Sequence, residues 1–123
     1  PRAVASSCAV PGTFPPVTID DATYLDGGLW SPISADLLVD DALDAAVVIS
    51  PLGGTDPIGR AFTASVDREI GELVAAGTDV ELLTPPTPIN PLAAFDESKR
   101  VQYFESGRAD GKAAAERVAE LLG

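Results

Sequence analysis

Residues 45–84, AAVVISPLGGTDPIGRAFTASVDREIGELVAAGTDVELLT, decide the fold of this chain. They open with an unbroken apolar run at 45–50, rich in β-branched side chains, which is typical of a strand covered on both faces in a parallel sheet. A second strand is predicted at 79–84, after an amphipathic helix. Strands that are joined through a helix lie parallel, so this stretch predicts an α/β layout.

The helix between these strands has clear limits. Asp56 and Pro57 suit its N-cap and first position, and Gly77 ends it. Apolar residues recur along it at helical spacing: Ile58, Phe62, Val66, Ile70, Leu73 and Val74. Charged residues that include Arg68, Glu69 and Glu72 lie between them, and we expect these charges on the helix surface.

A proline-rich loop at 85–91 leads to a last helix, predicted at 96–122. Its apolar and small residues recur every three or four positions: Val101, Phe104, Arg108, Gly111, Ala115, Val118 and Leu122. The small residues would allow close packing on a neighbour. The glycines at 107 and 111 are poor helix formers, so a break there stays open.

Upstream of this region, the sequence predicts smaller elements. A short buried helix or turn is expected at 5–10, and a hairpin with Asp20-Asp21 in its turn follows at 17–25. Ser34 can cap a short helix that follows. The chain begins without Met or a secretory pattern, and we expect it to be one piece of a longer polypeptide. We expect a single domain over 1–123 and no second domain.

Composition excludes several classes of function. The chain has 123 residues and a net charge of −11, from 19 acidic and 8 basic side chains. This argues against nucleic acid as a partner and gives no attraction to anionic lipid. No apolar run is long enough to cross a bilayer. The absence of His removes Ser-His-Asp and Cys-His catalysis and His-based zinc motifs. No metal and no cofactor are predicted.

Three weaker candidates have simpler interpretations. The glycine-rich loop at 53–59 lacks the Gly-Lys-Ser/Thr of a phosphate loop, and Pro57 removes a donor. Cys8, the only cysteine, is predicted to be a buried structural thiol. The carboxylates of Asp40, Asp41 and Asp44 lack the spacing of a calcium loop and are expected in solvent.

The remaining candidate is the tripeptide Asp26-Gly27-Gly28, at the end of the predicted hairpin. A plain turn explains it on its own, since Asp-Gly is a common turn pair. The glycines would allow backbone angles that side chains forbid, and they leave Asp26 at the lip of the turn.

The neighbours of this tripeptide resemble the C-terminal half of patatin-like phospholipases. Such proteins have a small-residue segment that ends in Pro, Phe and Pro-Pro-Val, here at 5–17, before a hairpin and Asp-Gly-Gly. Ser31-Pro32, the helix start at 35–37 and the strand at 45–50 also match. The close match covers 5–51, and beyond it only the order of elements agrees. Asp21 departs from the family, which often has glycine there.

The resemblance implies part of a three-layer α/β/α sandwich and a Ser-Asp dyad that hydrolyses acyl esters of lipids. Asp26 would be the dyad base, with Gly27 and Gly28 shaping its motif; no substrate-binding residue is assigned. No Gly-x-Ser-x-Gly or oxyanion loop occurs in the chain, so both would lie in an N-terminal half outside it, and the chain alone should be inactive. A lipid or small ester, that missing half and a second copy of the chain are the expected partners.

The sequence does not determine the compartment, and a cytoplasmic or peripheral membrane location is favoured. A non-catalytic acidic α/β module for binding or assembly, with Asp26 only a turn residue, is the alternative.

Overall fold

The fold is seen in a computed structural model that describes residues 1–90 and 93–123. Pro91, at the end of the predicted proline-rich loop, lies outside the described residues. The chain divides into two compact units, Pro1–Pro32 and Ile33–Gly123, and each is described by itself.

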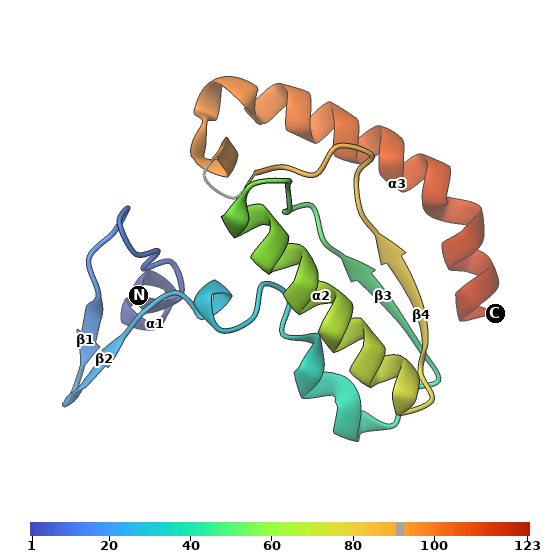
Figure 1. Ribbon diagram of the computed structural model, residues 1–123, viewed down its shortest axis with the longest axis horizontal. Coiled ribbons are helices and arrows are strands. Elements are labelled where there is room, and N and C mark those ends of the chain that lie inside the picture. Colours follow the sequence, from blue (N-terminus) through green and yellow to red (C-terminus); the bar gives the residue numbers. More distant parts are fainter. Residues whose placement is uncertain (91–92) are drawn as a thin grey trace. The chain divides into compact units, whose positions relative to one another are not determined.

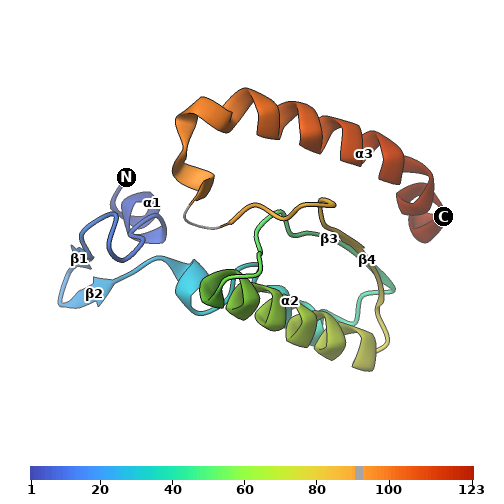
Figure 2. The same cartoon turned by 45° about the horizontal axis from the view of Figure 1, so that its top comes forward.

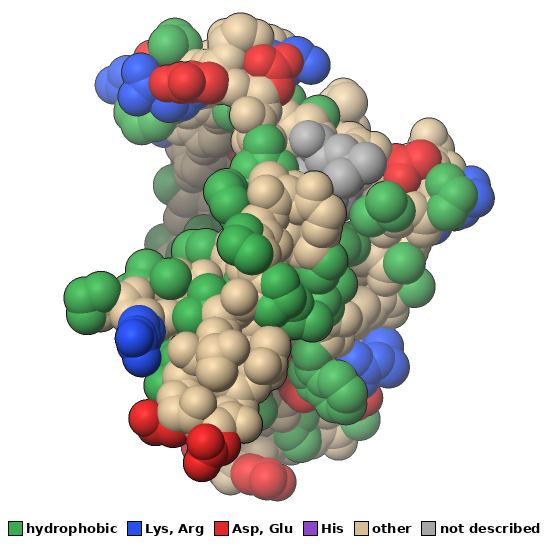
Figure 3. Space-filling view, turned by 90° about the vertical axis from the view of Figure 1, so that its left-hand side faces the viewer, with side chains coloured by type: hydrophobic (Ala, Val, Ile, Leu, Met, Phe, Trp, Pro, Cys, Tyr) green, Lys and Arg blue, Asp and Glu red, His purple; other side chains and the backbone are tan. Residues whose placement is uncertain are grey.

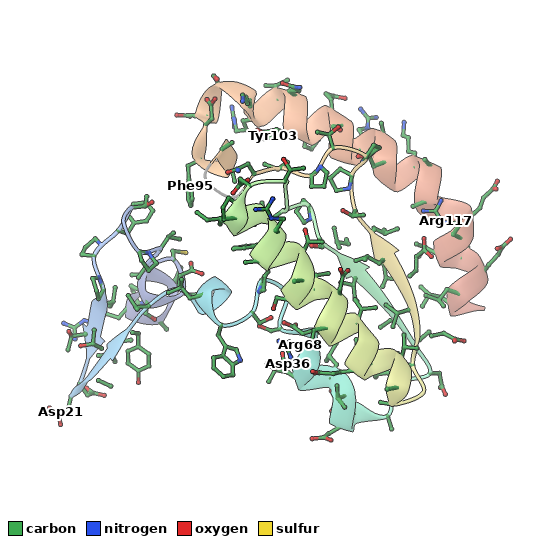
Figure 4. The ribbon with its side chains drawn as sticks, viewed as in Figure 1. Asp21, Asp36, Arg68, Phe95, Tyr103 and Arg117 are labelled. Carbon is green, nitrogen blue, oxygen red and sulfur yellow. The ribbon has the colours of Figure 1, made fainter. Side chains whose placement is uncertain are left out.

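The first unit contains a short helix and a hairpin (Figure 1). Helix α1 spans Arg2–Ser7, and strands β1 (Val17–Ile19) and β2 (Ala22–Tyr24) pair antiparallel. The hairpin is confirmed; Asp20 takes a positive φ of 52° in its turn, and Asp21 lies at its tip (Figure 4). The helix starts earlier than predicted and is mostly exposed, because six residues cannot cover much surface.

The second unit is built on the predicted parallel pair. Strand β3 (Ala45–Ile49) pairs with β4 (Asp79–Leu83), in a register that joins Ala45 to Asp79 and Ile49 to Leu83. Helix α2 (Pro57–Ala75) contacts β4, and helix α3 (Arg100–Leu122) contacts both strands. Figure 2 shows α2 and α3 on opposite faces of this pair. The mixed α/β class is confirmed and is consistent with the layers that the resemblance implies.

The strand β3 is less covered than predicted. Val48 is buried, but Ile49 is exposed at the carboxyl end of the strand. The residues of β3 between Ala45 and Val47 are half-buried. A sheet that has two strands in the described residues offers too little area for full burial of both faces.

Helix α2 begins and ends as predicted. The Asp56 carboxylate accepts hydrogen bonds from the Ile58 and Gly59 amides at 3.0 and 3.1 Å. It also accepts one from the Asn90 side chain, which follows β4. The Gly59 bond is the largest cause that lowers the pKa of Asp56, while desolvation opposes it. After the helix, Gly77 adopts a φ of 99°, which favours glycine.

The buried face of α2 contains a charge that the sequence prediction placed on the surface. Glu69 is 0% exposed, between Val66 and Leu73. Its carboxylate accepts the Ala35 amide at 2.9 Å and the Ser65 hydroxyl at 3.1 Å, and Arg68 lies 3.4 Å away. The prediction was wrong because hydrogen bonds from another segment satisfy this carboxylate.

The short helix after Ser34 is a 3₁₀-helix, η2 (Ala35–Asp41). Ser34 makes no side-chain capping bond to it and adopts a positive φ of 52°. The predicted cap is therefore wrong, because a capping residue needs extended backbone angles, which Ser34 does not have. Glu69 of α2 accepts the Ala35 amide, the first of η2. This bond attaches η2 to α2.

The last helix is continuous, but it presents a different face than predicted. The 3₁₀-helices η3 (Ala93–Phe95) and η4 (Glu97–Lys99) precede α3, which runs through both glycines without a break. Val101 and Phe104 are 67% and 66% exposed, whereas Ala114 is buried. Figure 4 shows Arg117 on α3, and its guanidinium bonds Glu81 of β4 at 2.7 Å.

Exposed apolar side chains occur in both units. Figure 3 shows several groups of them on the face it presents. Among residues 1–90 and 93–123, we find no helix with the length and hydropathy needed to cross a bilayer.

We predict that Glu69→Ala lowers the free energy of unfolding by about 1–3 kcal/mol, because it leaves the buried Ala35 amide without its acceptor. Denaturant unfolding of the full chain measures this change. The matched control is Glu72→Ala, whose partly exposed ion pair with Arg68 should contribute about 0–1 kcal/mol. Equal losses in the two variants would contradict the prediction.

We also predict that Asp56 makes unfolding depend on pH. Its folded pKa is lowered, so its stabilisation is present above the unfolded value of about 3.9 and disappears as pH falls through the folded pKa. Asp56→Asn keeps a capping oxygen but does not titrate there. The unfolding free energy of this variant should fall less between pH 5 and pH 2 than that of the parent chain. The same change of unfolding free energy with pH in the Asp56→Asn variant and the parent chain would contradict this prediction.

Candidate functional site

The tripeptide Asp26-Gly27-Gly28 forms a capped 3₁₀ turn in the first unit. Asp26 is the N-cap of η1 (Gly27–Leu29), and its Oδ1 accepts the Gly28 amide at 2.7 Å. The carboxylate is partly buried. Among residues 1–90 and 93–123, no hydrogen bond reaches its Oδ2 and no serine bonds to it. One carboxylate oxygen is thus fixed by the backbone, and the other is available to a donor.

The segment before the hairpin holds this turn in place. The Asp26 amide donates to the Ala9 carbonyl at 3.1 Å, and Ala9 is almost fully buried. The small-residue segment therefore fixes the backbone of the candidate carboxylate. The run of small residues is visible in the sequence, but the sequence does not show that the Ala9 carbonyl accepts the Asp26 amide.

The glycines serve a different purpose from the one predicted. Neither Gly27 nor Gly28 has a positive φ. A Cβ added at Gly28 would lie 2.8 Å from Asp26 Oδ1, whereas one added at Gly27 would meet nothing within 4 Å. Glycine at position 28 therefore leaves space for the carboxylate in its observed position, and its backbone angle does not call for glycine.

Two of the weaker candidates have definite places in the structure. Cys8, the C-cap of α1, is exposed, so the predicted buried thiol is wrong. In the loop at 53–59, the Asp56 carboxylate accepts hydrogen bonds from the Ile58 and Gly59 amides at the start of α2. An anionic side chain therefore takes the position that a phosphate would need, which agrees with rejecting a phosphate loop. Asp40, Asp41 and Asp44 are exposed, as expected.

Elsewhere in the described part of the chain, two serine hydroxyls bond carboxylates within or beside helices. Ser65 bonds Glu69 along α2, and Ser98 bonds Asp96 at the start of η4 at 2.6 Å. Both carboxylates also accept backbone amides, and these bonds tie local elements together. In residues 1–90 and 93–123, no three His, Cys, Asp or Glu side chains group so as to hold a metal.

The second unit has a hollow of about 700 Å³ beside the carboxyl ends of β3 and β4. Its lining combines apolar side chains of the strands, such as Ile49 and Leu83, with Tyr103, Asp110 and Arg117 of α3. Parallel sheets commonly bind ligands beyond the carboxyl ends of their strands. The sequence prediction missed this hollow, because it arises where α3 leaves the sheet partly uncovered.

We predict that Gly28→Ala disturbs the Asp26 carboxylate, while Gly27→Ala does not. The new methyl group at position 28 should break a hydrogen bond worth about 1 kcal/mol, which corresponds to a loss of about fivefold in amide protection. Hydrogen exchange of the residue 28 amide, corrected for the intrinsic rate of alanine, measures this loss. Equal protection in the two variants would contradict the steric explanation.

Comparison with known proteins locates a family signal at this turn. The model of the family described as patatin-like phospholipase matches residues 1–39. This match includes α1, the hairpin and the whole Asp26 turn. No curated protein and no solved structure matches the chain. The match over its first 39 residues supports a patatin-like origin for this chain.

Proposed function

We propose that this chain is the C-terminal part of a patatin-like acyl ester hydrolase in which Asp26 is the base of a Ser-Asp dyad. The observation that carries the proposal is that the family match covers the complete Asp26 turn. The chain contains no Gly-x-Ser-x-Gly sequence. In the proposed enzyme, the nucleophilic serine and the oxyanion loop therefore come from an N-terminal half of the same domain.

The geometry of the turn suits such a base. A carboxylate in water is a weak base toward a hydroxyl, so it must be held within hydrogen-bond reach and partly shielded from water. The Gly28 amide holds Oδ1 at 2.7 Å, and Oδ2 is left to accept a second donor. The Ala9 carbonyl restrains the backbone of the same residue. Both restraints come from the matched segment.

In the proposed reaction, the serine oxygen attacks the acyl carbonyl while its proton passes to Oδ2 of Asp26. The ester bond breaks, and the leaving alcohol takes that proton. Water then attacks the acyl-serine and gives up a proton to Asp26, which returns it to the serine oxygen as the acid leaves. The substrate class is an acyl ester of a lipid. No step requires histidine, which this chain lacks.

We predict that Asp26→Asn lowers kcat/KM for a soluble short-chain nitrophenyl ester by about 100- to 10,000-fold, because the amide cannot accept the serine proton. The assay uses the full-length protein that carries this chain. Asp21→Asn, at the exposed hairpin tip (Figure 4), is the matched control and should keep normal turnover. Thermal unfolding of both variants verifies that the fold is intact.

Near-normal turnover of the Asp26→Asn variant would overturn the dyad. A fluorophosphonate probe separates the proposal from the non-catalytic binding or assembly module. It should label a serine outside residues 1–123, and Asp26→Asn should reduce the labelling. Absence of labelling in the full-length protein would favour the binding module, and labelling of a serine within 1–123 would show a different nucleophile.

A further inference from the structure

The parallel pair in the second unit leaves one side of each strand without a neighbouring strand. Among residues 1–90 and 93–123, the sheet that contains β3 has two strands. Helices α2 and α3 lie on its two faces (Figure 2), so a further strand can join it only at an edge. Backbone amides and carbonyls are obligatory hydrogen-bonding groups, and an open edge presents a row of them. Water or another strand must therefore satisfy each edge.

Two hydrogen bonds fix which amides of β3 face β4. The Asp79 amide donates to the Asp44 carbonyl, and the Ser50 amide donates to the Leu83 carbonyl, both at 2.9 Å. In a parallel ladder, the amides of successive residues point alternately to the two sides of their strand. Because the Ser50 amide points to β4, every second amide before it in β3 does the same.

The remaining amides of β3 point away from β4. They belong to Ala45, Val47 and Ile49, and we call this row the β3 outer edge. The Asp79 amide fixes the alternation of β4 in the same way. There, the amides that point away from β3 are those of Val80 and Leu82, which form the β4 outer edge.

The composition of the two strands distinguishes these edges. Residues 45–55 contain no charged side chain, and β3 itself has no proline and an unbroken register with β4. Strands that end a sheet in natural proteins are commonly protected by charges, prolines or bulges. β4 carries Asp79 and Glu81, and Glu81 bonds Arg117 of α3 at 2.7 Å. β4 thus has the composition of an edge strand, whereas β3 has that of an interior strand.

The charge of the chain selects the partner of the β3 outer edge. A second copy would bring a net charge of −11 to a chain of the same charge, and like charges repel. A strand of the same polypeptide is present at a high effective concentration, because the chain connects it. Both arguments select the N-terminal half that the proposed function requires as the source of the strand.

We propose that the β3 outer edge is the seam at which a β-strand of this N-terminal half joins the sheet. The outer amides and carbonyls of β3 bond that strand, and β3 becomes an interior strand with a neighbour on each side. The proposal rests on the function proposed above only for the existence of the N-terminal half. It adds which edge of the sheet the two halves share.

Hydrogen exchange in the full-length protein tests the seam directly. We expect the amides of Val47 and Ile49 to exchange at least about 100-fold more slowly than those of Val80 and Leu82, after correction for intrinsic rates. Light scattering at the same protein concentrations gives the oligomeric state. Slow exchange in the monomer supports the seam. Fast exchange of Val47 and Ile49 would overturn it, and so would protection that is found only in a dimer.

A pair of proline variants gives a matched test in the same protein. Proline lacks the amide, and a strand tolerates it where that amide faces solvent. Val47 and Leu82 are both half-buried, and both point their amides away from the pair. We expect Val47→Pro to lower the urea midpoint of unfolding at least about twice as much as Leu82→Pro. Equal shifts would contradict the seam.

Ester hydrolysis separates this proposal from the proposed function. An active full-length enzyme in which Val47 and Ile49 exchange fast would overturn the seam and leave the dyad intact. Slow exchange of these amides in a protein whose turnover is unaffected by Asp26→Asn would support the seam and overturn the dyad alone.

Discussion

The second unit depends on the parallel pairing of β3 with β4. Parallel strands cannot be joined by a tight turn, so the chain must cross over between them, and α2 makes this crossing. The pairing runs from Ala45–Asp79 to Ile49–Leu83 and leaves the carboxyl ends of both strands at one edge. The loops after β3 and β4 consequently meet there, where Gly53 donates to the Ile89 carbonyl at 2.9 Å and Asn90 bonds Asp56. The cap of α2 therefore joins two loops as well as starting a helix.

Carboxylates connect elements throughout this acidic chain. Glu69 holds η2 against α2, Glu81 receives Arg117 from α3, and Asp56 receives Asn90. The Glu69 bond is buried, where an unpaired charge would cost several kcal/mol, so it depends strongly on its donors. A high negative charge is thus compatible with this fold because some of the acidic groups are used in bonds between segments.

The Asp26 turn is also held by a carboxylate that accepts a backbone amide, here within three residues. The side chain closes a ring with the Gly28 amide, and the main chain is tied to Ala9. The same turn exposes Leu29 and Trp30. The hydrogen-bonded ring of Asp26 and Gly28 is therefore followed directly by the exposed apolar side chains of Leu29 and Trp30.

The sequence by itself determined the elements whose causes are local. The β-branched run at 45–50, the Asp56-Pro57 start, the Gly77 end and the Asp20-Asp21 hairpin each depend on residues within a few positions. The resemblance around Asp26 likewise depends on a contiguous segment, which is why the candidate site was found before its geometry was known.

Only the tertiary structure decided the features that depend on distant partners. Glu69 is buried because Ala35 and Ser65 donate to it, and helical spacing assigned its charge to the surface. The buried face of α3 is set by its contact with the sheet, where Ala114 is covered and Phe104 is not. Gly28 leaves space for one carboxylate oxygen of Asp26, which a side chain at position 28 would displace. Such features arise from atoms that packing brings together, and local sequence does not contain that information.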